Sequence, residues 1–206
     1  PKNGNHARGR QIATLNELAH EHFTTDSFGN LLKELSVNEN LSDKEKRNVQ
    51  LSTEDYDRNK KIPASFVHTL SNAINVGYHS WIQARRENSF SLFEKPLQAI
   101  IDLKKQEADL LGYEKYPYDA LMNDFDKGLT TTIVDKLFAD LHPQLSDLLA
   151  KIAAQPQVDN SFLHQHFDKT IQWDIGIEIL KRMHFNFDAG RQDISEHPFT
   201  TNFSSQ

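Results

Sequence analysis

Apolar residues recur every three or four positions along most of the chain, and this spacing places side chains on one face of an α-helix. The pattern predicts helices over about 12–22, 26–35, 43–61, 63–86, 96–111, 119–125, 130–152 and 171–183. No internal repeat or low-complexity linker separates these segments. We therefore expect an all-α fold of seven or eight helices.

Capping residues and prolines indicate where the predicted helices begin or are interrupted. Ser42 and Glu45 have the spacing of a capping box, in which each residue satisfies a backbone N–H at a helix start. Pro63 and Pro96 are each expected at the first residue of a helix, where their missing N–H costs nothing. Pro143 lies inside a long helical pattern, so it should kink or divide that helix.

Helical periodicity ends near residue 187. The segments 193–195 and 199–201 have the composition of short extended pieces, so we expect extended segments near the C-terminal end. The sequence ends at Gln206 without a helix stop. We interpret this ending as the interruption of a longer protein.

Composition narrows the functional classes. The chain has 206 residues and a formal net charge of −6, which disfavours nucleic-acid binding because phosphates require a basic face. No apolar run reaches the roughly 20 residues of a membrane-spanning helix. The absence of cysteine excludes disulfides and thiolate chemistry and suits a reducing compartment. We therefore expect a soluble, cytoplasmic protein.

The ten histidines prompt a search for a metal site. His20 and His22 flank a glutamate, but two helical ligands must lie four residues apart to face one ion. A two-residue spacing turns them about 200° apart, and His164 and His166 share this spacing. No nucleophile turn, phosphate loop or dinucleotide fingerprint occurs. The residues alone therefore predict a helical chain without an active site of its own.

Seven segments, taken in order, resemble the carboxypeptidase Taq family of metallocarboxypeptidases. They are residues 11–21, 55–58, 62–64, 81–90, 111–113, 117–121 and 190–201. The last segment contains His197-Pro198-Phe199, a tripeptide that is a signature of this family. On this basis the chain is identified as the N-terminal portion of a family member.

The resemblance implies a groove-forming, zincin-like fold. Residues 1–186 would form a helical wall or lid, and residues 187–206 would begin a small sheet at the border of the active site. The implied activity is the removal of C-terminal amino acids from peptides by water that zinc, or another divalent metal, activates. Family members hold this metal with a His-Glu-x-x-His helix and a further glutamate, which this sequence lacks. We therefore expect the chain alone to bind no catalytic metal and to be inactive.

Two site residues follow from the resemblance. His197 would help to position the substrate and Phe199 would shape the groove; alternatively, the tripeptide only fixes the turn into the sheet. The implied partners are a peptide substrate, the remainder of the enzyme and a second copy in a homodimer, with no nucleic acid or membrane. The alternative function is a non-catalytic helical scaffold or interaction module derived from the family.

Overall fold

The computed structural model describes residues 4–156, 158–194 and 196. In these residues the chain forms eight α-helices and one short 3-10 helix, η2 (Ser161–His164), and no strand. The α-helices are α1 (Asn5–Phe23), α2 (Asp26–Ser36), α3 (Asp43–Asn59), α4 (Ala64–Glu87), α5 (Ser91–Leu111), α6 (Pro117–Met122), α7 (Thr131–Ala153) and α8 (Lys169–Arg182). The prediction of an all-α fold is confirmed.

The chain divides into two compact units, a first unit, Pro1–Asp140, and a second unit, Leu141–Gln206. Helices α1 to α6 belong to the first unit and α8 belongs to the second, while the division falls within α7. These two units are defined only by how the chain packs, and they are not the two regions predicted from the sequence. The change from helical wall to sheet at residue 187 stays a prediction.

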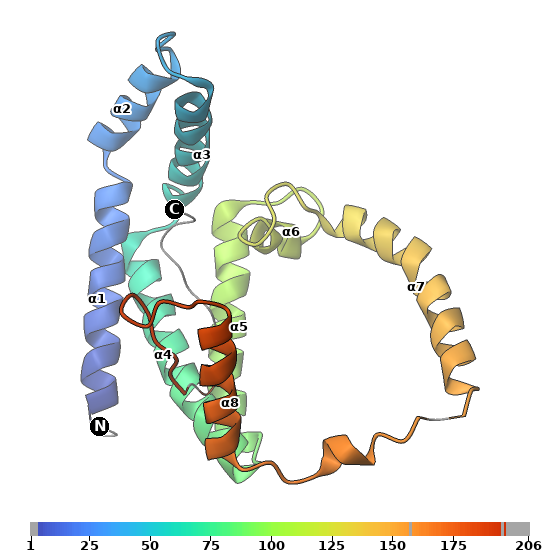
Figure 1. The fold of residues 1–206 in the computed structure, drawn as a ribbon. Helices are drawn as coiled ribbons and strands as arrows, with labels where there is room; N and C mark the ends of the chain where they lie inside the picture. Colours follow the sequence, from blue (N-terminus) through green and yellow to red (C-terminus); the bar gives the residue numbers. More distant parts are fainter. Residues whose placement is uncertain (1–3, 157, 195, 197–206) are drawn as a thin grey trace. The chain divides into compact units, whose positions relative to one another are not determined.

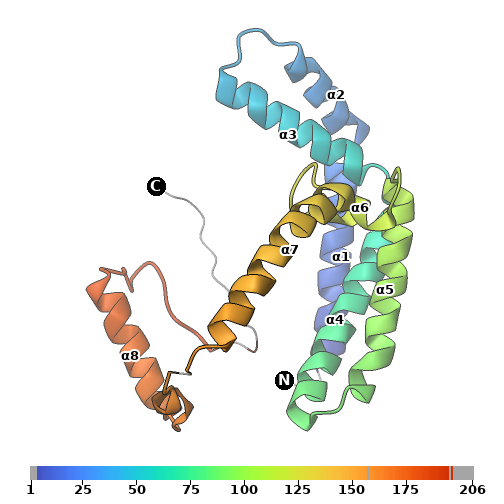
Figure 2. The ribbon, with the colours of Figure 1, turned by 90° about the vertical axis from the view of Figure 1, so that its right-hand side faces the viewer.

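Three long helices form the body of the first unit, with α4 lying between α1 and α5 and running antiparallel to both (Figures 1 and 2). Small residues let these helices approach one another. A Cβ added at Gly77 on α4 would lie 2.5 Å from Ile100 Cδ1 on α5. A Cβ added at Gly9 on α1 would likewise meet the Asn75 side chain on α4. Glycine at these positions therefore sets the spacing of the bundle.

Helices α2 and α3 form a hairpin that extends beyond one end of the bundle (Figure 1). Ser42 and Glu45 form the predicted capping box at the start of α3, with both reciprocal hydrogen bonds present. Tyr56 of α3 packs against Phe28 of α2, with ring centroids 6.0 Å apart. It also packs on Gly29, where an added Cβ would lie 2.5 Å from the Tyr56 Cζ atom. This aromatic contact over a glycine is joined by an ion pair between Lys60 and Asp26, with Nζ 2.8 Å from Oδ1.

The turn between α4 and α5 corrects one prediction. Asn88 ends α4 in the left-handed conformation (φ 48°), which asparagine tolerates better than most residues. Helix α5 then begins at Ser91, so the prediction that Pro96 opens this helix is wrong. Pro96 is the sixth residue of α5, where it removes one backbone N–H donor. The preceding turn carries Phe93, whose ring lies 3.9 Å from an added Cβ at Gly77, so packing favours the earlier start.

Two other prolines also differ from the sequence pattern. Pro63 is the cap before α4 rather than its first residue, a shift of one position. Helix α7 continues through Pro143, so this proline does not divide the helix, and the alternative that it kinks the helix stays a prediction. Because a proline removes a single N–H donor, the hydrogen bonds on either side keep the two halves in one helix.

The second unit contains η2 and α8. The Asp168 carboxylate caps α8 by accepting the Thr170 N–H at 2.8 Å. After the helix, His184 takes a left-handed conformation (φ 58°), and the rings of Phe185 and Phe187 pack with centroids 5.0 Å apart. Residues 187–194 form no strand. The extended piece expected at 199–201 lies outside the described residues.

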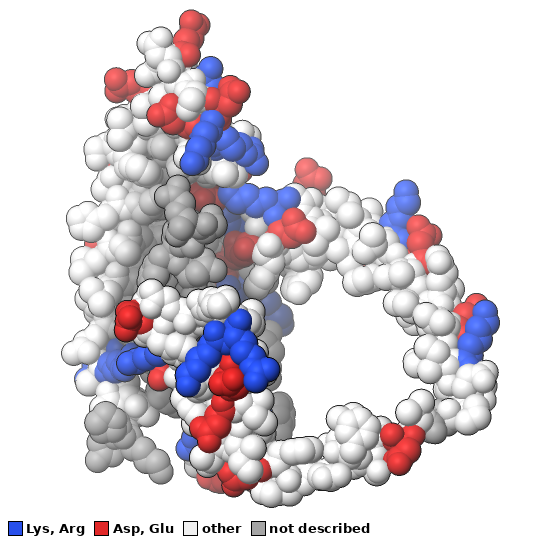
Figure 3. Space-filling view, viewed as in Figure 1, with Lys and Arg blue, Asp and Glu red and all other residues white. Residues whose placement is uncertain are grey.

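Few side chains are enclosed, and much apolar surface is open. In the described part of the chain, the buried apolar side chains are Ala13, Leu32, Ala84, Ala108, Leu111 and Ala120. Acidic and basic side chains lie beside one another on α2 and α3, whereas much of the remaining visible surface is uncharged (Figure 3). None of the helices, over the residues described, has the length and apolar character to cross a membrane.

Candidate functional site

A groove of about 740 Å³ runs between α1 and α4 in the first unit. Its walls are mainly apolar, with Ile12 and Phe23 on α1 facing Phe66, Leu70 and Ile74 on α4. Ile74 is 47% exposed, so the groove is open to solvent. Concave apolar surfaces of this size with a few polar groups are typical of binding sites.

His20 is the buried polar residue of this groove. Its side chain is 9% exposed, and Nε2 lies 2.7 Å from the Ile62 carbonyl oxygen. A carbonyl oxygen can only accept, so Nε2 carries the proton and donates it. This bond ties α1 to the segment between α3 and α4. His22 points to solvent instead, which agrees with the expectation that the two histidines cannot face one ion.

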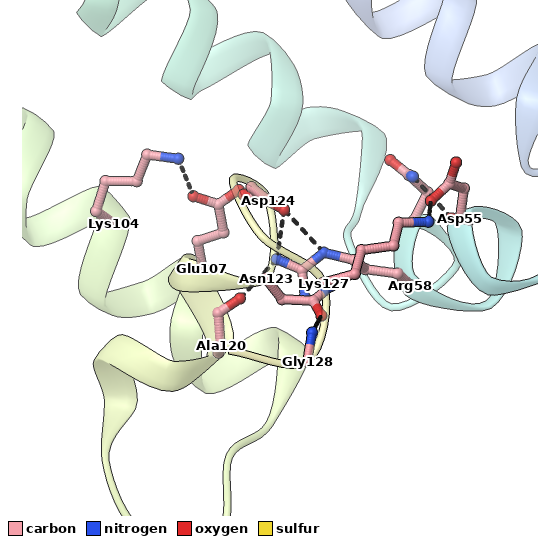
Figure 4. A network of polar contacts seen from close by, with 10 residues as sticks. Asp55, Arg58, Lys104, Glu107, Ala120, Asn123, Asp124, Lys127 and Gly128 are labelled. Atoms are coloured by element: carbon pink, nitrogen blue, oxygen red, sulfur yellow. Dashed lines mark hydrogen bonds and ion pairs between the residues drawn. The ribbon is translucent and has the colours of Figure 1, made fainter. Parts of the chain in front are cut away.

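A network of charged side chains joins α3 to the segment that contains α6 (Figure 4). The Arg58 guanidinium donates to Asp124 Oδ1 at 2.6 and 3.0 Å, and to the Ala120 carbonyl oxygen at 2.7 Å. Lys127 Nζ donates to Asp55 Oδ1 at 2.7 Å. These contacts hold the α2–α3 hairpin to the end of the bundle and line a polar hollow of about 670 Å³.

The pKa shifts in this region have structural causes. The hydrogen bond from Lys127 to Asp55 raises the pKa of the lysine. Asp119 accepts hydrogen bonds from the backbone N–H and the hydroxyl of Thr131, both at 2.7 Å, and these lower the pKa of its carboxyl. Each shift stabilises the charged form at neutral pH. In the structure Lys127 is thus an ion-pair partner, and Asp119 is an acceptor for the start of α7.

The described residues do not fit a catalytic metal. Over residues 4–156, 158–194 and 196, no three His, Cys, Asp or Glu side chains come together in a way that could hold an ion. His164 ends η2, and both His164 and His166 are exposed. The predicted site residues His197 and Phe199 lie outside the described residues. The groove and the charged network can bind and position, but they contain no evident nucleophile–base pair.

Sequence reasoning missed both His20 and the Arg58 network. Ala13 and His20 are seven residues apart, two helical turns, and the structure rather than the apolar pattern shows that this side of α1 is buried. Arg58 and Asp124 are separated by 66 positions. Nothing in a single sequence pairs residues so far apart.

Comparisons with known proteins agree on one family. The family model for carboxypeptidase Taq (M32) metallopeptidase matches residues 1–206. Carboxypeptidase 1 of Bacillus subtilis is 32% identical over 203 residues, which cover 98% of this chain and 40% of that protein. The crystal structure of BsuCP is similar with a TM-score of 0.92 at 31% identity, covering 98% of this chain and 41% of the other. The structure of CHT is 46% identical with a TM-score of 0.75 and the same coverage.

Proposed function

Because this chain belongs to the carboxypeptidase Taq (M32) family of metallopeptidases, we propose that it is the N-terminal portion of a metal-dependent carboxypeptidase that removes C-terminal amino acids from peptides. The observation that carries this proposal is the family match over every residue from 1 to 206. The chain spans about two fifths of the length of the relatives it matches, and these relatives are named carboxypeptidases.

The proposed metal is zinc, held by residues that this sequence does not contain. Support for a metal comes from the family, whose members are metallopeptidases. Within the proposal, residues 1–186 act as a helical wall whose open apolar groove lies between α1 and α4. The partners are a peptide substrate, the remainder of the enzyme and a second copy of the protein. The lack of cysteine suits a cytoplasmic location.

The assay uses the protein isolated from its own cells at its natural length. With bound metal, it should release free amino acids from a peptide that has a free C-terminal carboxylate. A chelator should abolish this release and added zinc should restore it, while a C-terminally amidated peptide stays intact. Failure of the metal-loaded protein to release amino acids would contradict the proposed function.

The 206-residue chain provides the matched control. It should release nothing under the same conditions, because the residues that bind metal and activate water are assigned outside it. Release of amino acids by this chain in a chelator-sensitive way would refute that assignment while leaving the family membership intact.

His197 and Phe199 are proposed to border the active site, with His197 positioning substrate. If so, His197→Ala should lower kcat/KM of the natural-length enzyme at least tenfold, which corresponds to about 1.4 kcal/mol of transition-state binding, without lowering Tm. If the tripeptide only fixes a turn, Tm should fall and kcat/KM of the folded enzyme should be unchanged.

A further inference from the structure

Helix α8 carries apolar side chains on two sides. The first side is an isoleucine stripe, formed by Ile171, Ile175 and Ile179 at four-residue spacing. A second apolar set follows another side of the same helix: Trp173, Ile177 and Leu180. Asp174, Glu178 and Arg182, also at four-residue spacing, run along the helix beside the isoleucine stripe. A helix with apolar side chains on two separate sides is typical of one that packs against more than one neighbour.

The second unit covers only one of these two sides. Trp173, Ile177 and Leu180 are half-buried. The Gln192 side chain lies against the helix at Gly176, 3.2 Å from the position of an added Cβ. The isoleucine stripe, in contrast, is 60%, 54% and 52% exposed at its three residues in chain order. The chain therefore supplies packing for one apolar side of α8 and leaves the other open.

A polar border gives the isoleucine stripe a defined edge. Arg182 Nε pairs with Glu178 Oε1 at 3.0 Å, and these residues flank a shallow hollow of about 490 Å³ together with the stripe. Contiguous exposed apolar surface with a polar rim marks an interaction site. The stripe has the form of a docking surface for one further apolar element.

We propose that the isoleucine stripe of α8 docks the part of this protein that its relatives carry outside the matched two fifths of their length. This inference rests on the proposed function, since the occupant is the remainder of the metallopeptidase. The relatives extend well beyond the match, which covers 98% of this chain and only 40% or 41% of each of them. A continuous chain of that length supplies the additional layer that α8 lacks.

The size of the stripe favours a covalently linked occupant over a second copy. Three half-exposed isoleucines present a few hundred Å² at most, whereas a stable complex between separate chains buries about 800 Å² per partner. Two separate copies would lose translational and rotational freedom on association. A segment of the same polypeptide has lost most of that freedom already, so a small apolar surface is enough to hold it.

Hydrogen exchange tests this assignment. We compare the backbone amides of α8 in the 206-residue chain and in the protein isolated at its natural length. At natural length they should exchange at least tenfold more slowly, because the covered stripe opposes local opening. In the natural-length protein, Ile175→Gln should make these amides exchange at least tenfold faster. Lys181→Gln, which places the same side chain at an exposed position of α8 outside the stripe, should change exchange less than twofold.

The isolated chain supplies the second control. Since Ile175 is exposed there, Ile175→Gln should leave α8 exchange within twofold; a large loss would show that this chain itself already packs the stripe, which overturns the proposal. The proposal would also be overturned if the α8 amides exchanged equally fast at both lengths, or if the natural length were 206 residues. Protection that rises with the concentration of the 206-residue chain would overturn it too. The exchange outcomes report packing alone, so they are independent of the peptide-release assay, whereas a natural length of 206 residues would overturn the proposed function as well.

Discussion

Replacing Arg58 with methionine removes the Arg58 part of the network that joins α3 to the segment containing α6, and it leaves the bond from Lys127 to Asp55 in place. The guanidinium makes two hydrogen bonds to Asp124 Oδ1 and one to the Ala120 carbonyl oxygen. Methionine keeps much of the apolar stem and removes all three bonds. We expect the α2–α3 hairpin to open more readily while the bundle of α1, α4 and α5 stays folded.

The magnitude follows from the exposure of the partners. The Asp124 side chain is 40% exposed, so solvent screens the ion pair and limits its value to about 1 kcal/mol. The bond to the Ala120 carbonyl contributes about 1 kcal/mol more, a usual net value for a hydrogen bond in a protein. A total of about 2 kcal/mol corresponds to roughly 30-fold faster opening of the hairpin.

Native-state hydrogen exchange of the α3 amides measures this opening directly. The matched control is Arg47→Met on the same helix, because Arg47 bonds only to Gln50 one turn away, and its exchange should change less than twofold. Adding 1 M salt should reduce the coupling between Arg58→Met and Asp124→Asn in a double-mutant cycle. A change below twofold for Arg58→Met would refute the view that this network holds the hairpin.

Three further predictions concern single contacts. His20→Ala leaves a carbonyl without its donor and should lower the free energy of unfolding by about 1–3 kcal/mol, whereas His22→Ala should stay within about 0.5 kcal/mol in the same urea titration. Gly29→Ala places a methyl group against the Tyr56 ring and should cost about 1–3 kcal/mol by thermal denaturation; an unchanged Tm would show that the hairpin can adjust. The lowered pKa of Asp119 means that its charged form contributes stability above its ordinary pKa of 3.8, and this contribution is lost as pH falls through the lowered value. Urea titrations from pH 6 to pH 2 should therefore show a shallower loss of stability for Asp119→Asn than for the original chain, and equal slopes would contradict the assignment.

Local signals were sufficient for much of the helical fold. The capping box at Ser42 and Glu45 could be predicted because its two residues are three positions apart and act on the same helix start. Helical periodicity placed the long helices because amphipathic spacing is a property of neighbouring residues. The effects of the prolines on the helices were predicted less well. The effect of Pro96 depends on how strongly Phe93 packs against α4, which is a tertiary contact that spacing does not reveal.

The candidate site was less predictable for the same physical reason. The groove between α1 and α4 and the Arg58–Asp124 pair join segments that are far apart in the chain, and a single sequence does not record such pairing. Family resemblance identified the segments that contain Arg58 and His20 without giving either a role. The two residues that it did assign, His197 and Phe199, lie outside the described residues, so their roles stay predictions.

The central claim is that these 206 residues are a portion of a longer metallocarboxypeptidase. The intact mass of the protein isolated from its own cells tests this claim most directly. We predict a mass more than twice the 23.7 kDa of this chain, because the relatives it matches are covered over only about two fifths of their length. A mass near 23.7 kDa would contradict the claim and would leave a helical family member that lacks the proposed catalytic part.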